Sequence, residues 1–247
     1  MCMHACGGTE GNMTGILALE TATEACSVAI AVGDGVCERH EVVPRQHSQR
    51  LFSMLRELLP GGELRSAGIE AVAYGSGPGS FTGLRIAASA AQGLAYACAL
   101  PAVPVSTLAT QAQAALHQGL AQADALVLST VDARIDEVYA ALYGFRAGLA
   151  ELLEGPWVLP PAALAPERDG PLLAVGSGCR YLEAFPARLR SRLHHADATL
   201  LPSARDMLPL AREVFRRGEI QAPQAVSPVY VRDEISWKKI PQQGKPA

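Results

Sequence analysis

The sequence lacks a long apolar run. No stretch comes near the roughly twenty uninterrupted apolar residues of a membrane-spanning helix, so we expect no membrane span. Charged residues are sparse, at 18% of the 247 residues, whereas hydrophobic residues make up 49%, which excludes a disordered polar chain. The net charge of −3 offers no general attraction to nucleic acid, which a direct RNA-binding protein usually shows as a basic face.

Paired metal ligands are missing as well. The six cysteines include no CxxC pair, and a zinc knuckle needs two such pairs. The six histidines include no two at i, i+4 spacing, so no helical zinc site is expected. A disulfide framework is not expected in a chain of this length, and we therefore predict a cytoplasmic protein. The sequence assigns no metal or other cofactor to this chain.

Residues 1–12 are polar and glycine-rich and lack the apolar middle of a signal peptide. We expect them to be a disordered N-terminal extension that precedes Met13, and either Met1 or Met13 can serve as the start. Cys2, His4 and Cys6 are compatible with a small metal-binding tip, but the disordered end is favoured.

Residues 13–118 are expected to form one α/β lobe. Three short apolar or alternating runs open it, with Gly33-Asp34-Gly35 as the hairpin turn between the second and third. Apolar periodicity, with glycine and proline punctuation, then predicts helices over 48–59, 82–99 and 107–118 and strands over 69–74 and 101–105.

Residues 119–226 repeat this pattern and are expected to form a second lobe. The run 172–178 (LLAVGSG) echoes 71–77 (AVAYGSG) at an offset of 101 residues. Asp132-Ala133-Arg134 follows a strand as Glu20-Thr21-Ala22 does, at an offset of 112 residues. A β-β-β-α-β-α unit used twice predicts an α/β fold of two lobes, each a mixed sheet flanked by helices. Residues 227–247 are expected to begin with an edge strand and to end in a mobile tail.

The most distinctive segment is residues 77–85 (GPGSFTGLR), a glycine-rich turn from strand to helix. Free N–H groups at such a helix start suit an anion, but the spacing matches neither a Walker A loop nor a dinucleotide fingerprint, so a steric role is favoured. Gly77 and Gly79 are expected to supply backbone conformations that a β-carbon disfavours, and Thr82 to cap the helix. Arg85 is expected to pair with an acidic group, either within its own lobe or on a partner protein.

Five segments together resemble the TsaB family of tRNA threonylcarbamoyladenosine biosynthesis proteins: LALETATEACSVAI, HSQRLFSMLRELL, GSGPGSFTGLRIAASAAQGLA, VDARIDEVY and SPVYVRDE. The resemblance spans residues 15–233, and one departure is Glu20, where the family usually has Asp. It implies a duplicated actin-like (ASKHA) fold, a heterodimer with the transferase TsaD and a complex with the ATPase TsaE. It also implies a homodimer in the absence of these partners, contact with tRNA only through the complex, and ATP and metal on the partner subunits.

Matching this chain to the related TsaD proteins implies a nucleotide cleft that has lost its chemistry. The two histidine ligands of TsaD correspond to Thr107 and Gln111, whose neutral side chains cannot replace imidazoles. The phosphate loop of its second lobe corresponds to residues 132–136, where Asp132 and Arg134 stand. Glu20 and Asp132 remain open to two interpretations, as bases or Mg²⁺ ligands and as acidic residues in turns.

Surface contacts are then expected to carry the function. The resemblance implies that the helices over 48–59 and 82–99 form a four-helix interface with TsaD or with a second copy. The candidate interface residues are Phe52, Met54, Leu55, Arg85, Ala87, Ala90, Ala91 and Leu94. The alternative is that the small residues pack only against the sheet of their own lobe.

The expected function is that of a non-catalytic scaffold and activator of TsaD. The main rival is an active phosphotransferase or ATPase of the same fold, which requires a working phosphate loop. A metalloprotease lacks its histidine pair, and a free RNA-binding module conflicts with the acidic net charge.

Overall fold

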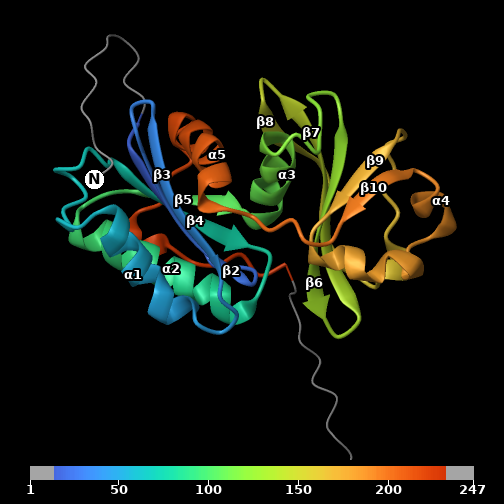
Figure 1. Cartoon of the computed structure of the whole chain (residues 1–247), viewed down its shortest axis with the longest axis horizontal. Helices are drawn as coiled ribbons and strands as arrows, with labels where there is room; N and C mark the ends of the chain where they lie inside the picture. The colour runs from blue at the N-terminus through green and yellow to red at the C-terminus, as the bar shows by residue number, and fades with distance from the viewer. Residues whose placement is uncertain (1–13, 232–247) are drawn as a thin grey trace, which may run out of the picture.

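The computed structural model describes residues 14–231, which form two lobes side by side, each built on a five-stranded sheet (Figure 1). The first sheet has the order β3-β2-β1-β4-β5: Gly35–Val42, Ala25–Val32, Ile16–Glu20, Ala71–Gly77 and Ala102–Ser106. The second has the order β8-β7-β6-β9-β10: Leu149–Leu159, Glu137–Arg146, Leu126–Arg134, Leu172–Val175 and Leu193–Asp197.

Both sheets have the same mixed topology. β1 is antiparallel to β2 and parallel to β4, and β6 is antiparallel to β7 and parallel to β9. β4 and β9, which carry the two Gly-Ser-Gly echoes, therefore hold equivalent places. The predicted duplication into two α/β lobes is confirmed.

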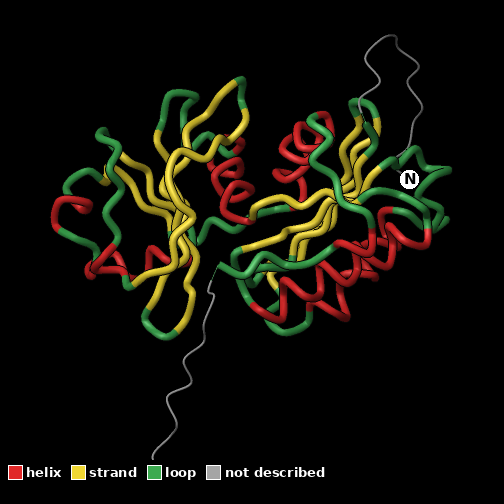
Figure 2. The backbone as a smooth tube through the Cα atoms, turned by 180° about the vertical axis from the view of Figure 1, so that it is seen from behind, coloured by secondary structure: helices red, strands yellow, loops and turns green. Residues whose placement is uncertain are grey.

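Helices cover both faces of each sheet (Figure 2). α1 (His47–Leu58) and α2 (Phe81–Ala97) pack on one face of the first sheet, and α5 (Ala204–Arg216) packs on the other. In the second lobe α3 (Thr107–His117) covers one face. The short helices η1 (Pro161–Ala163), η2 (Ser177–Ala184) and α4 (Ala187–Arg190) lie on the other side.

The lobes exchange helices across their sequence boundary. α3, which ends the first half of the chain, packs on β6 and β8 of the second lobe, and α5, which follows β10, packs on β1 and β2 of the first. Ala204 at the start of α5 donates its N–H to Ser27 Oγ of β2 at 2.9 Å. The expected ranges 13–118 and 119–226 thus describe the repeat along the sequence, whereas packing joins the two halves.

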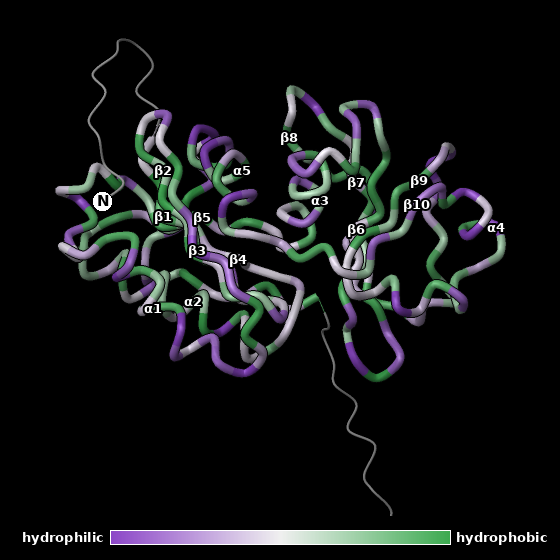
Figure 3. The backbone as a smooth tube through the Cα atoms, viewed as in Figure 1, coloured by the Kyte–Doolittle hydropathy of each residue, from purple (hydrophilic) through white to green (hydrophobic). Residues whose placement is uncertain are grey.

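The central strands show why these segments form a sheet buried on both faces. In β1, Leu17 and Leu19 face the core beneath α1 and α2, while Ile16 and Ala18 face α5. Side chains that alternate between two apolar layers give the continuous hydrophobic run that the sequence shows there. Figure 3 shows mainly hydrophobic residues along these central strands and several hydrophilic residues along α5.

The sequence analysis assigned no residue range to three elements of the second half of the chain. These elements are β8, β10 and α5. The helix that the repeat predicts after the third strand is absent, since only the three-residue η1 lies between β8 and β9. Apart from the edge strand expected from residue 227, the other predicted strands and helices are present, with ends that differ by a few residues.

The last described segment returns to the first lobe. Gln221 forms a single antiparallel bridge with Ala102 of β5, and η3 (Pro223–Ala225) follows. Tyr74 Oη donates to Ser227 O at 3.1 Å, and Val229 N–H donates to Ser76 O at 2.8 Å. The edge strand expected from residue 227 is therefore replaced by this extended contact. The expected N-terminal extension, with Cys2, His4 and Cys6, and the tail beyond residue 231 lie outside the described residues.

Candidate functional site

The glycine-rich turn between β4 and α2 is closed by the turn that follows β1. Ser80 N–H donates to Ala22 O at 2.7 Å, and Thr21 Oγ1 donates to Gly83 O at 2.7 Å. A β-carbon on Gly79 would lie 2.5 Å from Ala22 O, and one on Gly83 would lie 2.0 Å from Thr21 O. The glycines thus allow two backbone segments to touch, which supports the steric role over an open anion loop.

Ser80, not Thr82, caps α2. The helix begins at Phe81, and Ser80 Oγ accepts the Gly83 N–H at 3.4 Å. The prediction of a Thr82 cap is wrong, because Thr82 already lies inside the first turn, where its side chain is past the capping position. Gly77 has φ +116°, as expected of a position that a β-carbon disfavours, and it lies against Leu84 and Val229 O.

Glu20 ends β1 as a carboxylate with no exposed surface. Its Oε1 accepts the Ala22 N–H at 2.8 Å, and its Oε2 accepts the Thr107 hydroxyl at 3.2 Å. Burial raises its pKa to about 7, although these hydrogen bonds favour the charged form. Gly75 on β4 completes the enclosure, since a β-carbon there would lie 2.4 Å from Oε2.

Thr107 and Gln111 are also fully buried, one turn apart on α3. Gln111 Oε1 accepts the Ser129 hydroxyl at 2.7 Å, and Gln111 Nε2 donates to Leu200 O at 2.8 Å. A β-carbon on Gly176 would lie 2.4 Å from Nε2 of Gln111, so backbone and side chain fill this space. The two residues are arranged as hydrogen-bonding core groups that join α3 to its surroundings.

The structure does not place Asp132 and Arg134 where the internal repeat predicted them, at the positions equivalent to Glu20 and Ala22. Leu19 pairs with Tyr74 in the first sheet, and Ser129 pairs with Val175 in the second. β4 and β9 are equivalent at an offset of 101 residues, so Tyr74 corresponds to Val175 and Leu19 corresponds to Ser129. Thr130 is therefore the position equivalent to Glu20, at an offset of 110 residues rather than 112. Asp132 and Arg134 lie further along, on the end of the β6–β7 hairpin, so the match was wrong by two residues.

The Asp132 carboxylate binds groups of its own lobe. Its Oδ1 accepts the Arg134 N–H at 2.9 Å and the Tyr181 hydroxyl at 3.2 Å. Its Oδ2 lies 3.2 Å from Arg180 Nη1 and 3.4 Å from Arg134 Nη1. The Asp132 side chain is 9% exposed and shapes the hairpin end. Within residues 14–231, no three His, Cys, Asp or Glu side chains are grouped as a metal site would need.

The proposed interface residues separate into two groups. Met54, Leu55, Ala87, Ala90 and Ala91 are buried in the core of the first lobe. These side chains pack against the sheet of their own lobe, which is the alternative that the sequence analysis left open. They offer no surface to a second molecule. Phe52 is 46% exposed, Arg85 is exposed, and Leu94 is half-buried.

The exposed sides of α1 and α2, which we call the α1–α2 face, carry large side chains that the sequence analysis passed over. Phe81 is 53% exposed and Tyr96 is 68% exposed. The Arg85 guanidinium carbon lies 3.9 Å from the centre of the Phe81 ring, and Arg85 Nε donates to Tyr230 Oη at 3.1 Å. Within residues 14–231, the contacts of the Arg85 side chain are therefore aromatic. An acidic group on a partner protein stays a prediction. Phe81 was visible inside the GPGSFTGLR motif, but the contact with Tyr230 joins distant parts of the chain.

Comparison with known proteins decides the family. A family model for TsaD, tRNA N6-adenosine threonylcarbamoyltransferase, matches residues 33–171. A tRNA threonylcarbamoyladenosine biosynthesis protein TsaB from Escherichia coli K12 is 40% identical, over 92% of this chain and 98% of its own length. The chain belongs to the TsaB family. A TsaB from Haemophilus influenzae is 34% identical over 93% of this chain and 98% of its own.

A solved structure of a protein named YeaZ, from Pseudomonas aeruginosa, has the same fold as this TsaB-family chain. It superimposes with a TM-score of 0.81 at 41% identity, covering 88% of this chain and all of that one. The fold is accordingly the duplicated actin-like two-lobe fold that the resemblance implied. Among the helices of the described region, none combines the length and the apolar character needed to cross a bilayer.

Proposed function

We propose that this chain is a non-catalytic subunit of the cytoplasmic machinery that adds threonylcarbamoyl to adenosine beside the anticodon of tRNA. In this proposal it binds and activates the transferase TsaD, acts in one complex with TsaE, and meets tRNA only through that complex. ATP and metal are bound by the partner subunits, and the chain forms a homodimer in their absence. Its family membership supports the pathway, and the proposal adds the role.

One observation supports the non-catalytic role: the glycine-rich turns that could bind a phosphate are closed by atoms of the protein itself. The Gly79 and Gly83 backbone touches the turn after β1, and Gly176 touches the Gln111 side chain. Phosphate binding needs open backbone N–H groups at such turns. This packing disfavours the rival function, an active phosphotransferase or ATPase.

The α1–α2 face supports a partner-binding role. It exposes aromatic side chains from both helices together with Arg85, and aromatic residues and arginine dominate the energetics of protein interfaces. Tyr96 also lines a surface hollow of about 540 Å³ beside Ile220 and Pro223. Large exposed aromatic groups on two adjacent helices suit a helical partner better than a small ligand.

Binding to purified TsaD from the same organism tests the proposal. The wild-type chain should form a stable complex, and Phe52→Asp should weaken it at least tenfold, because burying an unpaired charge in an interface costs several kcal/mol. Leu152→Asp is the matched control, since Leu152 is similarly exposed, at 47%, but lies on β8 of the other lobe. Absence of any wild-type complex would refute the proposed role.

A further inference from the structure

The end of the β6–β7 hairpin has an unusual backbone. Arg134, Ile135 and Asp136 all have positive φ, at +64°, +54° and +57°. Tight hairpin turns of this kind normally use glycine, asparagine or aspartate, and a β-branched residue with positive φ is a true outlier. Ile135 is nevertheless 76% exposed, so its side chain gains little from contacts within its own lobe.

The surrounding structure holds this strained turn in place. Asp132 accepts hydrogen bonds from the Arg134 N–H, the Tyr181 hydroxyl and the Arg180 guanidinium. The Asp132 N–H donates to Ser177 Oγ at 3.0 Å. The pairing register shifts between Asp132 and Arg134, as in a β-bulge, a feature that redirects side chains. Strain that is this well supported commonly marks a functional segment.

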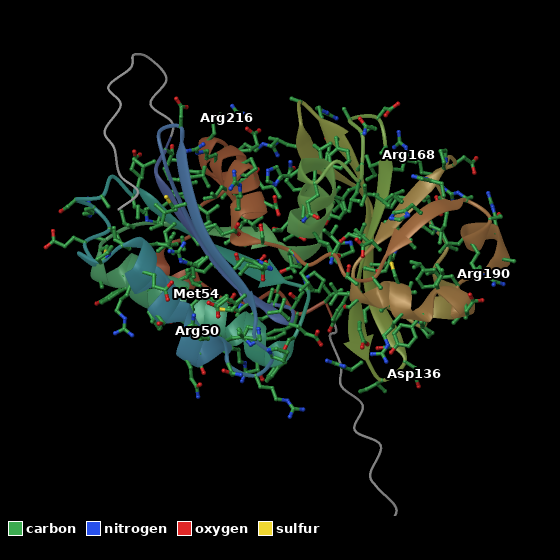
Figure 4. The ribbon with its side chains drawn as sticks, viewed as in Figure 1. Arg50, Met54, Asp136, Arg168, Arg190 and Arg216 are labelled. Carbon is green, nitrogen blue, oxygen red and sulfur yellow. The ribbon has the colours of Figure 1, made fainter. Side chains whose placement is uncertain are left out.

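The hairpin also reaches beyond its counterpart in the first lobe. β1 ends at Glu20, whereas β6 continues past the equivalent Thr130 to Arg134. Figures 1 and 2 show the hairpin end at the same lower edge of the molecule as α1 and α2. Figure 4 labels Asp136 at this tip, and Figure 3 shows a hydrophobic point on a mostly hydrophilic hairpin end.

We propose that the Arg134-Ile135-Asp136 tip is a second docking element for the protein that occupies the α1–α2 face. This inference rests on the proposed function, which supplies that partner as TsaD. Ile135 inserts into an apolar depression of the partner. Arg134, whose side chain is 74% exposed and is held at one end by Asp132, pairs with a carboxylate at the rim of that depression. One partner spanning both lobes would then fix the angle between them.

A protein suits the tip better than RNA does. RNA-binding surfaces recognise bases by stacking on flat aromatic or guanidinium groups. Ile135, at the point of the tip, offers neither, and the Arg134 guanidinium beside it is already paired with Asp132. Asp136 adds a negative charge beside it, which repels phosphates. An exposed aliphatic side chain flanked by one cation and one anion matches an apolar protein pocket with a charged rim.

Two substitutions at Ile135 test the proposal by titration against TsaD. Ile135→Asp should weaken binding at least tenfold with an unchanged melting temperature. Ile135→Gly should raise the melting temperature, because glycine relieves the positive-φ strain, and should still weaken binding about tenfold. A residue with only a structural role would not combine higher stability with poorer binding. Ala147→Gly, in the next hairpin turn at φ +51°, is the control and should bind within twofold of the wild type.

The possible outcomes separate this inference from the proposed function. If both Ile135 variants bind TsaD within twofold of the wild type while Phe52→Asp does not, the tip proposal is refuted and the proposed function stands. If they bind TsaD normally but the complex loses tRNA, the tip contacts RNA and the proposal is again refuted. If wild-type chain and TsaD do not associate, both fail.

Discussion

Thr21 and Gly83, which are 62 residues apart, lie against each other so closely that the helix start has no room for a side chain. The Thr21 hydroxyl donates to Gly83 O at 2.7 Å, and a β-carbon on Gly83 would lie 2.0 Å from Thr21 O. The contact fastens the turn after β1 to the start of α2. It closes the loop that would otherwise resemble an anion site.

Gly83→Ala should therefore lower the free energy of unfolding by about 3 kcal/mol, since backbone atoms must move to admit the methyl group. Gly93→Ala in the same helix is the matched control. Nothing lies within 4 Å of a β-carbon at Gly93, so alanine should stabilise the chain by up to about 1 kcal/mol through its higher helix propensity. Urea unfolding measures both, and equal effects would contradict the close contact at Gly83.

Glu20 should make stability fall as pH rises. Burial raises its pKa from 4.5 to about 7, so the folded chain holds a proton that the unfolded chain releases near pH 4.5. Its stabilising contribution is complete below pH 4.5 and is lost as the pH approaches about 7. Relative to Glu20→Gln, the wild type should lose about 3 kcal/mol over this interval. Parallel pH profiles for the two proteins in urea unfolding would show that Glu20 does not titrate in this way.

Ser80 and Thr82 should differ in their effect on stability. Ser80→Ala removes the acceptor of the Gly83 N–H and should cost about 1 kcal/mol. Thr82→Ala exchanges an exposed residue inside the helix for a better helix former and should be neutral or stabilising by a few tenths of a kcal/mol. Thermal unfolding of the two variants decides between them. A larger loss for Thr82→Ala would restore the cap that the sequence predicted.

Arg85→Ala should affect binding more than folding. Arg85 is exposed, and within residues 14–231 its side chain contacts Phe81 and Tyr230, which are themselves exposed, so the melting temperature should change by no more than about 2 °C. Affinity for TsaD should fall, because the variant releases both aromatic side chains from their fixed positions. Binding titrations with a melting curve check this. A collapsed melting temperature with unchanged affinity would make Arg85 structural.

Local patterns predicted most of the first lobe and the duplication, since strand and helix periods, the Gly33-Asp34-Gly35 turn and the Gly-Ser-Gly echoes are all short-range signals. Two features were not accessible in this way. The packing of α5 on the first sheet depends on contacts such as Ala204 with Ser27, 177 residues apart. β8 has no regular alternation of buried and exposed residues to reveal it.

The candidate site shows the same limit. The two-residue error at Asp132 arose because an insertion can be located only when the pairing of both sheets is known. Small residues such as Ala91 suit a helix interface and a helix–sheet contact equally well, and only the packing shows that the lobe's own core uses them. The contact of Arg85 with Tyr230 spans 145 residues and has no local signal.

Reconstituted tRNA modification measures whether this chain activates TsaD without catalysing a reaction of its own. Threonylcarbamoyl incorporation into unmodified tRNA should be measured with TsaD, TsaE and this chain together, and with each omitted in turn, alongside ATP hydrolysis by this chain alone. We predict incorporation when TsaD, TsaE and this chain are all present, and a loss of at least tenfold when this chain is omitted. The chain alone should show neither incorporation nor ATP hydrolysis. Modification or stoichiometric ATP turnover by the isolated chain, or full incorporation in its absence, would contradict the account.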